Sequence, residues 1–247
     1  MILRITIWVL AAVVLVIAFG IGRNRASRPD ARSGRTHLVL IGASIGQSWH
    51  LAGWPLRAHV PGFSAESLAQ WQFDKTESVD AVLLRPQMKF TLSRAWLRSF
   101  VRPPQKPGIV ILKECSSYFP GPLAAYETRT SQWVGRLRER GIRLILATVV
   151  PVTRARAAAN PRKQESLLEF NRWLRQYARG QDLAVLDLEA ALREESPAAY
   201  LRQDFAAPDG SHLNAAAYQH LDQVLLETLC SENVTVEDTA ACRRNSP

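Results

Sequence analysis

The sequence has few of the residues that build metal centres and disulfide frameworks, with three cysteines and five histidines in 247 residues. Three cysteines are too few for a disulfide framework, although Cys230 and Cys242 could pair in an oxidising compartment. The third, Cys115, follows a predicted buried strand and is expected to be a small packed residue. No Cys/His cluster has metal-ligand spacing, so we predict neither a structural metal nor a cofactor.

Internal repeats, low-complexity segments and nucleic-acid-binding motifs are also missing. The net charge is +9, yet no helix-turn-helix, zinc-finger or RNA-binding pattern accompanies it, so we expect no nucleic-acid partner. The hydrophobic fraction of 47% and the charged fraction of 21% are ordinary for a globular protein. The length favours one principal domain.

The N-terminus carries the one long apolar run, Ile5 to Ile21, which contains no charged residue. Its length is at the short end for a membrane-spanning helix and exceeds a typical signal-peptide core, and no convincing small-x-small cleavage site follows. We therefore predict an uncleaved single-pass anchor over 1–22, with a cleaved signal segment as the alternative. A polar linker over 23–35 follows, and its arginines are expected to attract anionic lipid: Arg23, Arg25, Arg28, Arg32 and Arg35.

Two features of the sequence favour opposite orientations of this anchor in the membrane. The arginines that follow the apolar run favour a cytoplasmic main domain by the positive-inside rule. The Cys230–Cys242 pair favours an oxidising compartment. We predict an extracytoplasmic or periplasmic domain and leave the cytoplasmic face open.

Beyond the linker, short apolar runs alternate with helical patterns. Strands are predicted at His37–Ile41, Arg57–Phe63, Ile109–Lys113, Arg143–Val150 and Leu183–Leu188. Helices are predicted at 126–140, 163–180 and about 214–229, from apolar residues at i, i+3 and i+4. This alternation predicts an α/β domain over 36–230, with a parallel sheet covered on both faces, and a polar tail over 231–247.

Ser44 follows the first predicted strand in the segment "GASIG". In parallel sheets, chemistry occurs beyond the carboxyl ends of the strands, which makes this serine a candidate nucleophile. The alternative is a serine that caps the following helix. The segment also fits G-x-S-x-G, but in α/β-hydrolases that elbow comes after several strands rather than after the first.

Asp209 and His212 occur together in "APDGSHLNAAAY", just before the last predicted helix. A serine hydroxyl needs a base to take its proton, and a histidine held by an acceptor on its other ring nitrogen does this best. Gly210 permits a sharp turn, and Asn214 can cap the helix that follows. The alternative is a capped helix start with a surface histidine.

Taken together, these two motifs resemble those of the SGNH (GDSL-type) hydrolases. "LIGASIG" is similar to the family's first block and "APDGSHLNAAAY" to its fifth. The resemblance spans about 36–229 and implies a three-layer α/β/α, flavodoxin-like sandwich of about five strands. It also implies ester hydrolysis, with Ser44 as nucleophile, His212 as base and Asp209 as orienting acid.

The oxyanion hole is where the sequence departs from the family. By resemblance, "VPGFSAESL" would supply a backbone donor at Gly62 or Ala65, beside the N–H of Ser44. The asparagine that usually follows the third strand is absent from "KECSSYFP". Ser116 or Ser117 could donate in its place, or a protonated Glu114 could; the alternative is that Glu114 pairs with Lys113 or an arginine.

We therefore expect a membrane-anchored serine esterase that acts on an ester-linked acyl group, with acetylated polysaccharide as a candidate substrate. An O-acyltransferase would use the same acyl-enzyme, and a non-catalytic binding protein would keep only the fold. Three tryptophans follow the nucleophile segment and are expected in the core rather than stacked on sugars: Trp49, Trp54 and Trp71. The sequence does not set the oligomeric state.

Overall fold

The computed structural model describes residues 36–69, 108–195, 199–231 and 242. The chain divides into two compact units, 1–34 and 35–247, and the described residues all belong to the second. The predicted anchor and linker therefore lie outside the described residues, as does Trp71. Within the described part of the chain, no helix has both the length and the apolar character that crossing a membrane requires.

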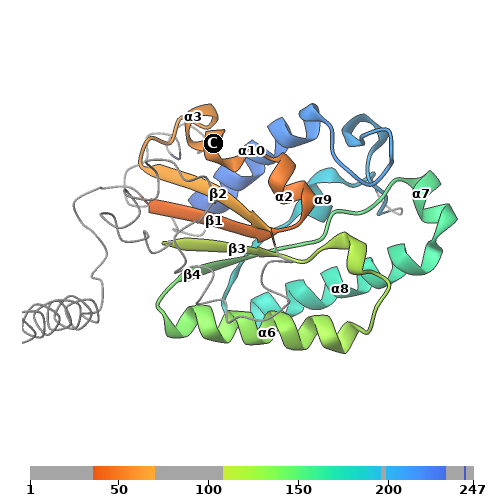
Figure 1. Cartoon of the computed structure of the whole chain (residues 1–247), viewed down its shortest axis with the longest axis horizontal. Helices are drawn as coiled ribbons and strands as arrows, with labels where there is room; N and C mark the ends of the chain where they lie inside the picture. Colours follow the sequence, from red (N-terminus) through yellow and green to blue (C-terminus); the bar gives the residue numbers. More distant parts are fainter. Residues whose placement is uncertain (1–35, 70–107, 196–198, 232–241, 243–247) are drawn as a thin grey trace, which may run out of the picture. The chain divides into compact units, whose positions relative to one another are not determined.

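A five-stranded parallel sheet forms the centre of the domain, in the order β2-β1-β3-β4-β5 (Figure 1). The strands are β1 (Thr36–Gly42), β2 (Phe63–Ala69), β3 (Ile109–Lys113), β4 (Arg143–Ala147) and β5 (Ala184–Leu186). This order is that of flavodoxin-like folds, in which the chain reverses direction across the sheet between β1 and β3. The predicted three-layer fold is confirmed.

The central strands are apolar on both sides because helices cover both faces of the sheet. Leu38 and Leu40 of β1 contribute to one core cluster, and Val39 and Ile41 to the other. All four side chains are buried, as expected for a strand of period two between two layers.

Helices form the outer layers (Figure 1). One face carries α6 (Leu123–Glu139) and α8 (Pro161–Gly180), and the other carries α2 (Ser44–Ser48), α3 (Trp54–Arg57), α9 (Leu188–Leu192) and α10 (Ala215–Ser231). The short α7 (Arg154–Ala159) precedes α8. The three helices predicted from periodicity correspond to α6, α8 and α10.

The second strand was predicted too early in the chain. The segment Arg57–Phe63 ends α3 and then turns, and β2 begins only at Phe63. His59 has a positive φ of 55°, which a strand excludes. Because β2 is an edge strand, its sequence "FSAESLA" is half polar and lacks the apolar signal of the central strands.

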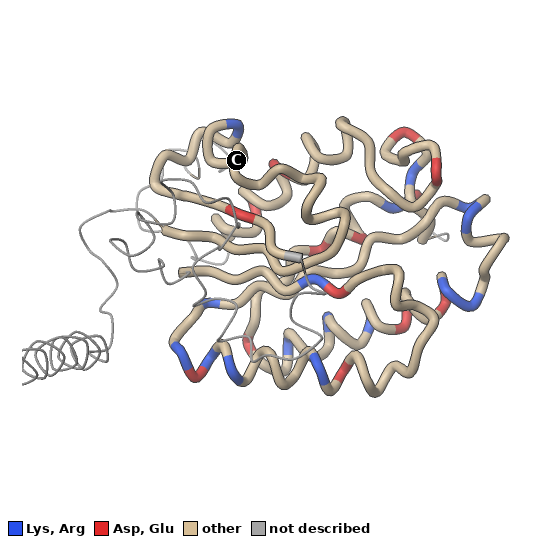
Figure 2. The backbone as a smooth tube through the Cα atoms, in the orientation of Figure 1, with Lys and Arg blue, Asp and Glu red and all other residues tan. Residues whose placement is uncertain are grey.

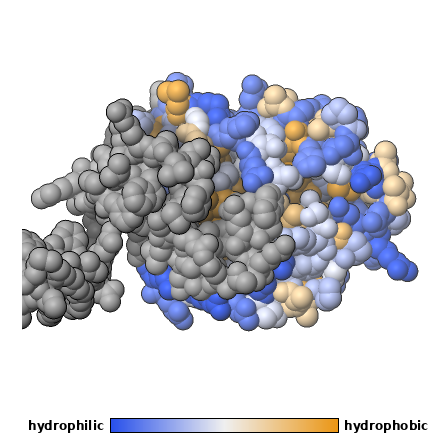
Figure 3. Space-filling view, viewed as in Figure 1, coloured by the Kyte–Doolittle hydropathy of each residue, from blue (hydrophilic) through white to orange (hydrophobic). Residues whose placement is uncertain are grey.

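The described surface is charged and largely hydrophilic. Basic and acidic residues occur together along α6 and α8, the outer helices of one layer (Figure 2). The face seen in Figure 3 is mostly hydrophilic where it is described. Leu56, 81% exposed, is the large apolar side chain that stands out on the described surface.

The predicted pairing of Cys230 with Cys242 is confirmed, since the two sulfur atoms are bonded. Cys230 lies in the last turn of α10, so the bond ties residue 242 of the tail to this helix. Cys115 is a buried free thiol, as expected.

Candidate active site

Ser44 lies at the carboxyl edge of the sheet, two residues after the end of β1. It is the first residue of α2, and the preceding Ala43 is the N-cap, so the hydroxyl does not cap this helix. Gly46 lies close to the strand, because a Cβ there would be 2.2 Å from Leu40 Cδ2. Its carbonyl accepts a hydrogen bond from Ser67 Oγ at 2.7 Å, which holds α2 against β2.

Asp209 and His212 lie in a tight loop before α10. Asp209 Oδ1 accepts hydrogen bonds from the backbone N–H of Ser211 at 3.0 Å and of His212 at 2.9 Å. Gly210 has φ +68°, and a Cβ there would be 2.5 Å from Thr153 Oγ1. The position therefore requires glycine for both its backbone conformation and the close approach of Thr153.

The loop is held at both of its ends. The N–H of Thr153 donates to the carbonyl of Gly210 at 3.0 Å, which ties the loop to the segment after β4. Asn214 Oδ1 accepts from the N–H of Ala217 at 3.0 Å and caps α10, as the sequence predicts. Asn214 Nδ2 also donates to the carbonyl of Asp204 at 2.7 Å.

The two segments bring Ser44, His212 and Asp209 into one hydrogen-bonded chain. His212 Nε2 is 3.0 Å from Ser44 Oγ, and His212 Nδ1 is 2.5 Å from Asp209 Oδ2. An ionised carboxylate can only accept, so Nδ1 carries the proton and Nε2 presents its lone pair to the serine. The alternative of a surface histidine that only starts a helix does not account for the contact with Ser44.

The charge on Asp209 is strongly favoured in this arrangement. The hydrogen bond from His212, together with the two backbone N–H groups, lowers the pKa of Asp209 from 3.8 to about 2. The carboxylate therefore stays ionised wherever the imidazole is needed as a base. This arrangement can take a proton from Ser44 and stabilise the imidazolium that forms.

The predicted donors Gly62 and Ala65 lie away from this edge, which corrects their assignment to the oxyanion hole. In the register of β1 and β2, Phe63 is opposite Thr36 at the amino end of the sheet, and Gly62 comes before it. Seven residues of strand at about 3.3 Å each put roughly 20 Å between Gly62 and the end of β1. Ala65 is opposite Leu38, inside the sheet.

Ser116, in contrast, lies at the carboxyl edge of the sheet, as Ser44 does. It begins a short 3-10 helix, Ser116–Tyr118, just after β3, the neighbour of β1 in the sheet. Its side chain is half-buried, and its role as an oxyanion donor stays a prediction. Ser117 is exposed, and its hydroxyl lies 2.8 Å from Cys115 Sγ.

Glu114 is buried and forms an ion pair with Arg129 of α6. The arginine donates to the carboxylate, which fits an ionised Glu114 rather than a protonated donor. Arg129 also lies over the rings of Tyr118 and Tyr126, each 5.4 Å from its centroid. The ion pair therefore fixes the loop that carries Ser116, and of the alternatives left open for Glu114 the structure shows the pairing with an arginine.

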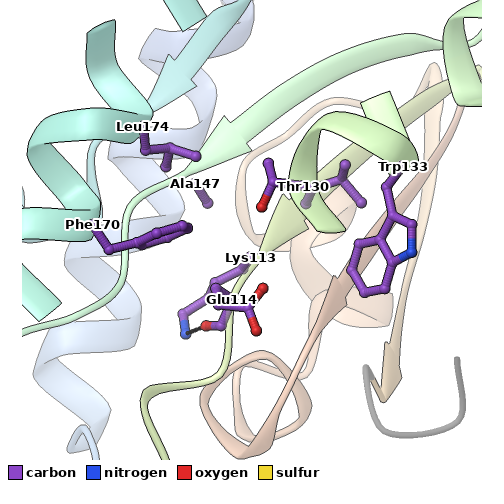
Figure 4. A pocket seen from close by; sticks show the side chains of 8 residues that line it. Lys113, Glu114, Thr130, Trp133, Ala147, Phe170 and Leu174 are labelled. Atoms are coloured by element: carbon purple, nitrogen blue, oxygen red, sulfur yellow. Dashed lines mark hydrogen bonds between the residues drawn. The ribbon is translucent and has the colours of Figure 1, made fainter. Parts of the chain in front are cut away.

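Lys113 is buried beside Glu114 at the end of β3. Its Nζ donates to the carbonyl of Glu114 at 3.0 Å, and burial lowers the pKa of Lys113 to about 8 (Figure 4). The small pocket around it lies on the α6 and α8 side of the sheet and contains none of the three residues above. It is lined by Leu112, Lys113, Glu114, Thr130, Trp133, Ala147, Phe170 and Leu174.

Sequence reasoning missed Thr153 and Asp222. Thr153 lies in no recognisable motif, and its role depends on Gly210, 57 positions away. Asp222 is buried in α10 and accepts a hydrogen bond from Trp49 Nε1 at 2.8 Å. Trp49 and Trp54 are 2% and 0% exposed, which confirms their prediction as core residues.

Comparison with known proteins identifies the family and the fold. Residues 97–220 match the model of the GDSL-like lipase/acylhydrolase family, a range that includes Asp209 and His212 and begins after Ser44. No curated protein sequence matches.

Solved structures share the fold at low identity. A lipase/acylhydrolase from Enterococcus faecalis has 14% identity and a TM-score of 0.56, with 83% of this chain and 100% of that chain covered. A GDSL-like lipase from Bacteroides thetaiotaomicron has 13% identity and a TM-score of 0.54, with 83% and 92% covered. An acetyl xylan esterase has 15% identity and a TM-score of 0.52, with 76% and 97% covered.

Proposed function

The chain belongs to the GDSL-like lipase/acylhydrolase family and is a hydrolase that acts on ester bonds, and we propose that Ser44, His212 and Asp209 form its catalytic triad. The observation that carries the proposal is the continuous hydrogen-bonded chain from Ser44 Oγ through His212 to Asp209. Ser44 lies near the start of the domain, whereas His212 and Asp209 lie near its end. A role in local structure, such as starting a helix, would not require these distant residues to meet.

In the proposed reaction, Ser44 Oγ attacks the ester carbonyl carbon and His212 Nε2 takes its proton. The tetrahedral intermediate collapses, and the leaving alkoxide takes that proton and departs as the alcohol. His212 then takes a proton from water, the hydroxide attacks the acyl-enzyme, and the acid product leaves as the proton returns to Ser44. Asp209 stays ionised throughout and holds the imidazole in the required tautomer.

Donors for the oxyanion are proposed at the carboxyl edge of β1 and β3. Ser44 begins α2, and the first N–H groups of a helix have no acceptor within it, so the N–H of Ser44 is available for an oxyanion. Ser116, on the loop held by the Glu114–Arg129 ion pair, is proposed as the second donor. A single such donor is typically worth on the order of 3 kcal/mol of transition-state stabilisation.

For the substrate, we propose an acyl group esterified to a carbohydrate. The similarity to an acetyl xylan esterase supports this only at the level of fold. The disulfide between Cys230 and Cys242 supports an extracytoplasmic domain, where envelope polysaccharides occur. The predicted anchor over 1–22 would hold the enzyme at that surface.

The experiment is to incubate the purified full-length chain with p-nitrophenyl acetate and with acetylated xylan, and to measure acetate release. The proposal predicts release from both substrates, and loss of release in Ser44→Ala. Acetyl transfer to an added sugar, with little free acetate, would make the chain an O-acyltransferase. Release that persists in Ser44→Ala would contradict the proposed nucleophile.

A further inference from the structure

We propose that Asp222 is a positioning residue for the active site, which joins the segment that carries Ser44 to the helix that follows His212. The inference rests on the proposed triad, because Ser44 and His212 must be aligned for it to matter. Asp222 lies in α10, ten residues after His212 in the chain and about two helical turns from the start of the helix.

Four hydrogen bonds converge on this one buried residue. Its carboxylate accepts from Trp49 Nε1 at 2.8 Å, from Arg57 Nε at 2.6 Å and from Arg57 Nη2 at 2.9 Å. Its carbonyl accepts from Trp54 Nε1 at 3.2 Å. Every donor comes from 49–57, the stretch that directly follows α2.

Arg57 extends this connection to the end of α2. Its guanidinium donates to the carbonyls of Trp49 and His50 at 3.3 Å each, while the same group holds Asp222. Trp49 is the C-cap of α2, and Ser44 is the first residue of that helix. The turn that closes the nucleophile helix is therefore fixed to α10 by side-chain and backbone contacts together.

The Ser44–His212 contact needs such a connection because its two partners share no element. A helix of five residues is too short to hold its own position, and α2 depends on its neighbours for orientation. His212 is held through the cap of α10 by Asn214. A movement of α10 against 49–57 would change the 3.0 Å contact directly, and a misplacement of about 1 Å can lower a rate by about 10²-fold.

The chemistry at this position also favours a positioning role over simple packing. Trp49 and Trp54 could pack as well without Asp222, but each presents a buried indole N–H that needs an acceptor in a fixed place. A carboxylate that binds the fork of Arg57 through both oxygens allows only one relative orientation of the two segments.

The test compares two variants that change this contact in different ways. Asp222→Asn keeps an acceptor of the same shape and removes the charge, and Trp49→Phe removes the indole N–H together with part of the buried ring. For the full-length chain with p-nitrophenyl acetate, we expect kcat to fall by about 10- to 100-fold in Asp222→Asn and less in Trp49→Phe. KM should change less than about 3-fold in either variant.

Asp187→Asn is the matched control, because Asp187 also accepts both arms of an arginine, Arg175, at 2.8 and 2.7 Å. It joins α8 to the start of α9, and its hydrogen-bond partners Arg175, Thr148 and Ala190 all lie outside 44–57. This variant should lose stability and keep kcat within about 3-fold.

A second readout separates positioning from general destabilisation. In a His212→Ala background, Asp222→Asn should lower the residual rate less than 2-fold, because there is no longer an alignment to lose. An unchanged kcat in folded Asp222→Asn, or an equal loss in the His212→Ala background, would overturn the proposal while leaving the triad intact. An inactive wild-type chain would instead contradict the proposed function.

Discussion

At the scale of single residues, the charge of Asp209 makes the acid side of the pH profile a test of the triad. A carboxyl group whose folded pKa is about 2, below its ordinary 3.8, contributes fully above pH 3.8 and loses its contribution as the pH falls through about 2. Down to about pH 3, the carboxylate of Asp209 should therefore stay ionised and gain no proton.

We therefore predict that log kcat/KM falls with a slope of one on the acid side, down to about pH 3. The profile would be measured by stopped-flow mixing with p-nitrophenyl acetate, so that the enzyme is assayed before it unfolds in acid. A slope near two, from two groups protonated together, would contradict an ionised Asp209.

Gly210 allows a second prediction at this scale. Gly210→Ala would place a Cβ 2.5 Å from Thr153 Oγ1 at φ +68°, so the loop must move, at a cost of about 1–3 kcal/mol. We expect kcat to fall at least 10-fold, because Asp209 and His212 lie one and two positions from Gly210 in the same loop. Activity assays and urea unfolding would measure the two effects.

The control for this variant is Gly135→Ala in α6. Gly135 has no atom within 4 Å of its added Cβ, and the helix interior favours alanine, so stability should rise by about 0.5–1 kcal/mol with kcat unchanged. A Gly210→Ala variant that behaves like Gly135→Ala would show that the loop does not depend on this conformation.

At the scale of elements, the start of α10 should matter for both stability and activity. Asn214→Ala removes the acceptor for the N–H of Ala217. It also removes the side-chain amide that donates to the carbonyls of Asp204 and Ala206. We predict a loss of about 1–2 kcal/mol in the free energy of unfolding, together with a lower kcat. Chemical denaturation and steady-state kinetics give the two values.

Asn160→Ala provides the comparison, since Asn160 caps α8 in the same way, by accepting from the N–H of Lys163 at 3.2 Å. The two variants should lose similar stability, but Asn160→Ala should keep its kcat. Equal losses of activity would mean that the cap of α10 has no specific connection with His212.

The elements also explain which parts of the fold the sequence could predict. The central strands β1, β3 and β4 are continuous apolar runs, and their prediction was correct because helices bury both faces. The edge strand β2 is half polar, so its start was misplaced to Arg57–Phe63. The oxyanion donors Gly62 and Ala65 rested on the resemblance of "VPGFSAESL" to a family block, and the structure places them before and inside β2.

The candidate triad was predictable because its signal is local. Ser44 lies two residues after a strand, and Asp209 and His212 are three residues apart in a loop with a required glycine. The Asp222 contacts join residues 165–173 positions apart, with no motif at either end. Such contacts depend on how α10 packs, which periodicity alone does not specify.

At the scale of the whole molecule, the disulfide at the end of α10 helps to predict on which side of the membrane the domain lies. Cys230 and Cys242 are bonded, and such bonds persist in oxidising compartments. We predict that an alkaline phosphatase fused to the C-terminus is active in cells, and that the native chain has one alkylatable thiol after denaturation without reductant. An inactive fusion and three free thiols would put the domain on the cytoplasmic side.

The most direct test of the central claim is to label the full-length chain with a fluorophosphonate and to identify the modified residue by peptide mass spectrometry. The account predicts a single adduct on Ser44 in the wild type, no adduct in Ser44→Ala, and labelling slowed by about 10³-fold or more in His212→Ala. An adduct on another serine, or a folded wild-type chain that does not react, would contradict the proposed triad.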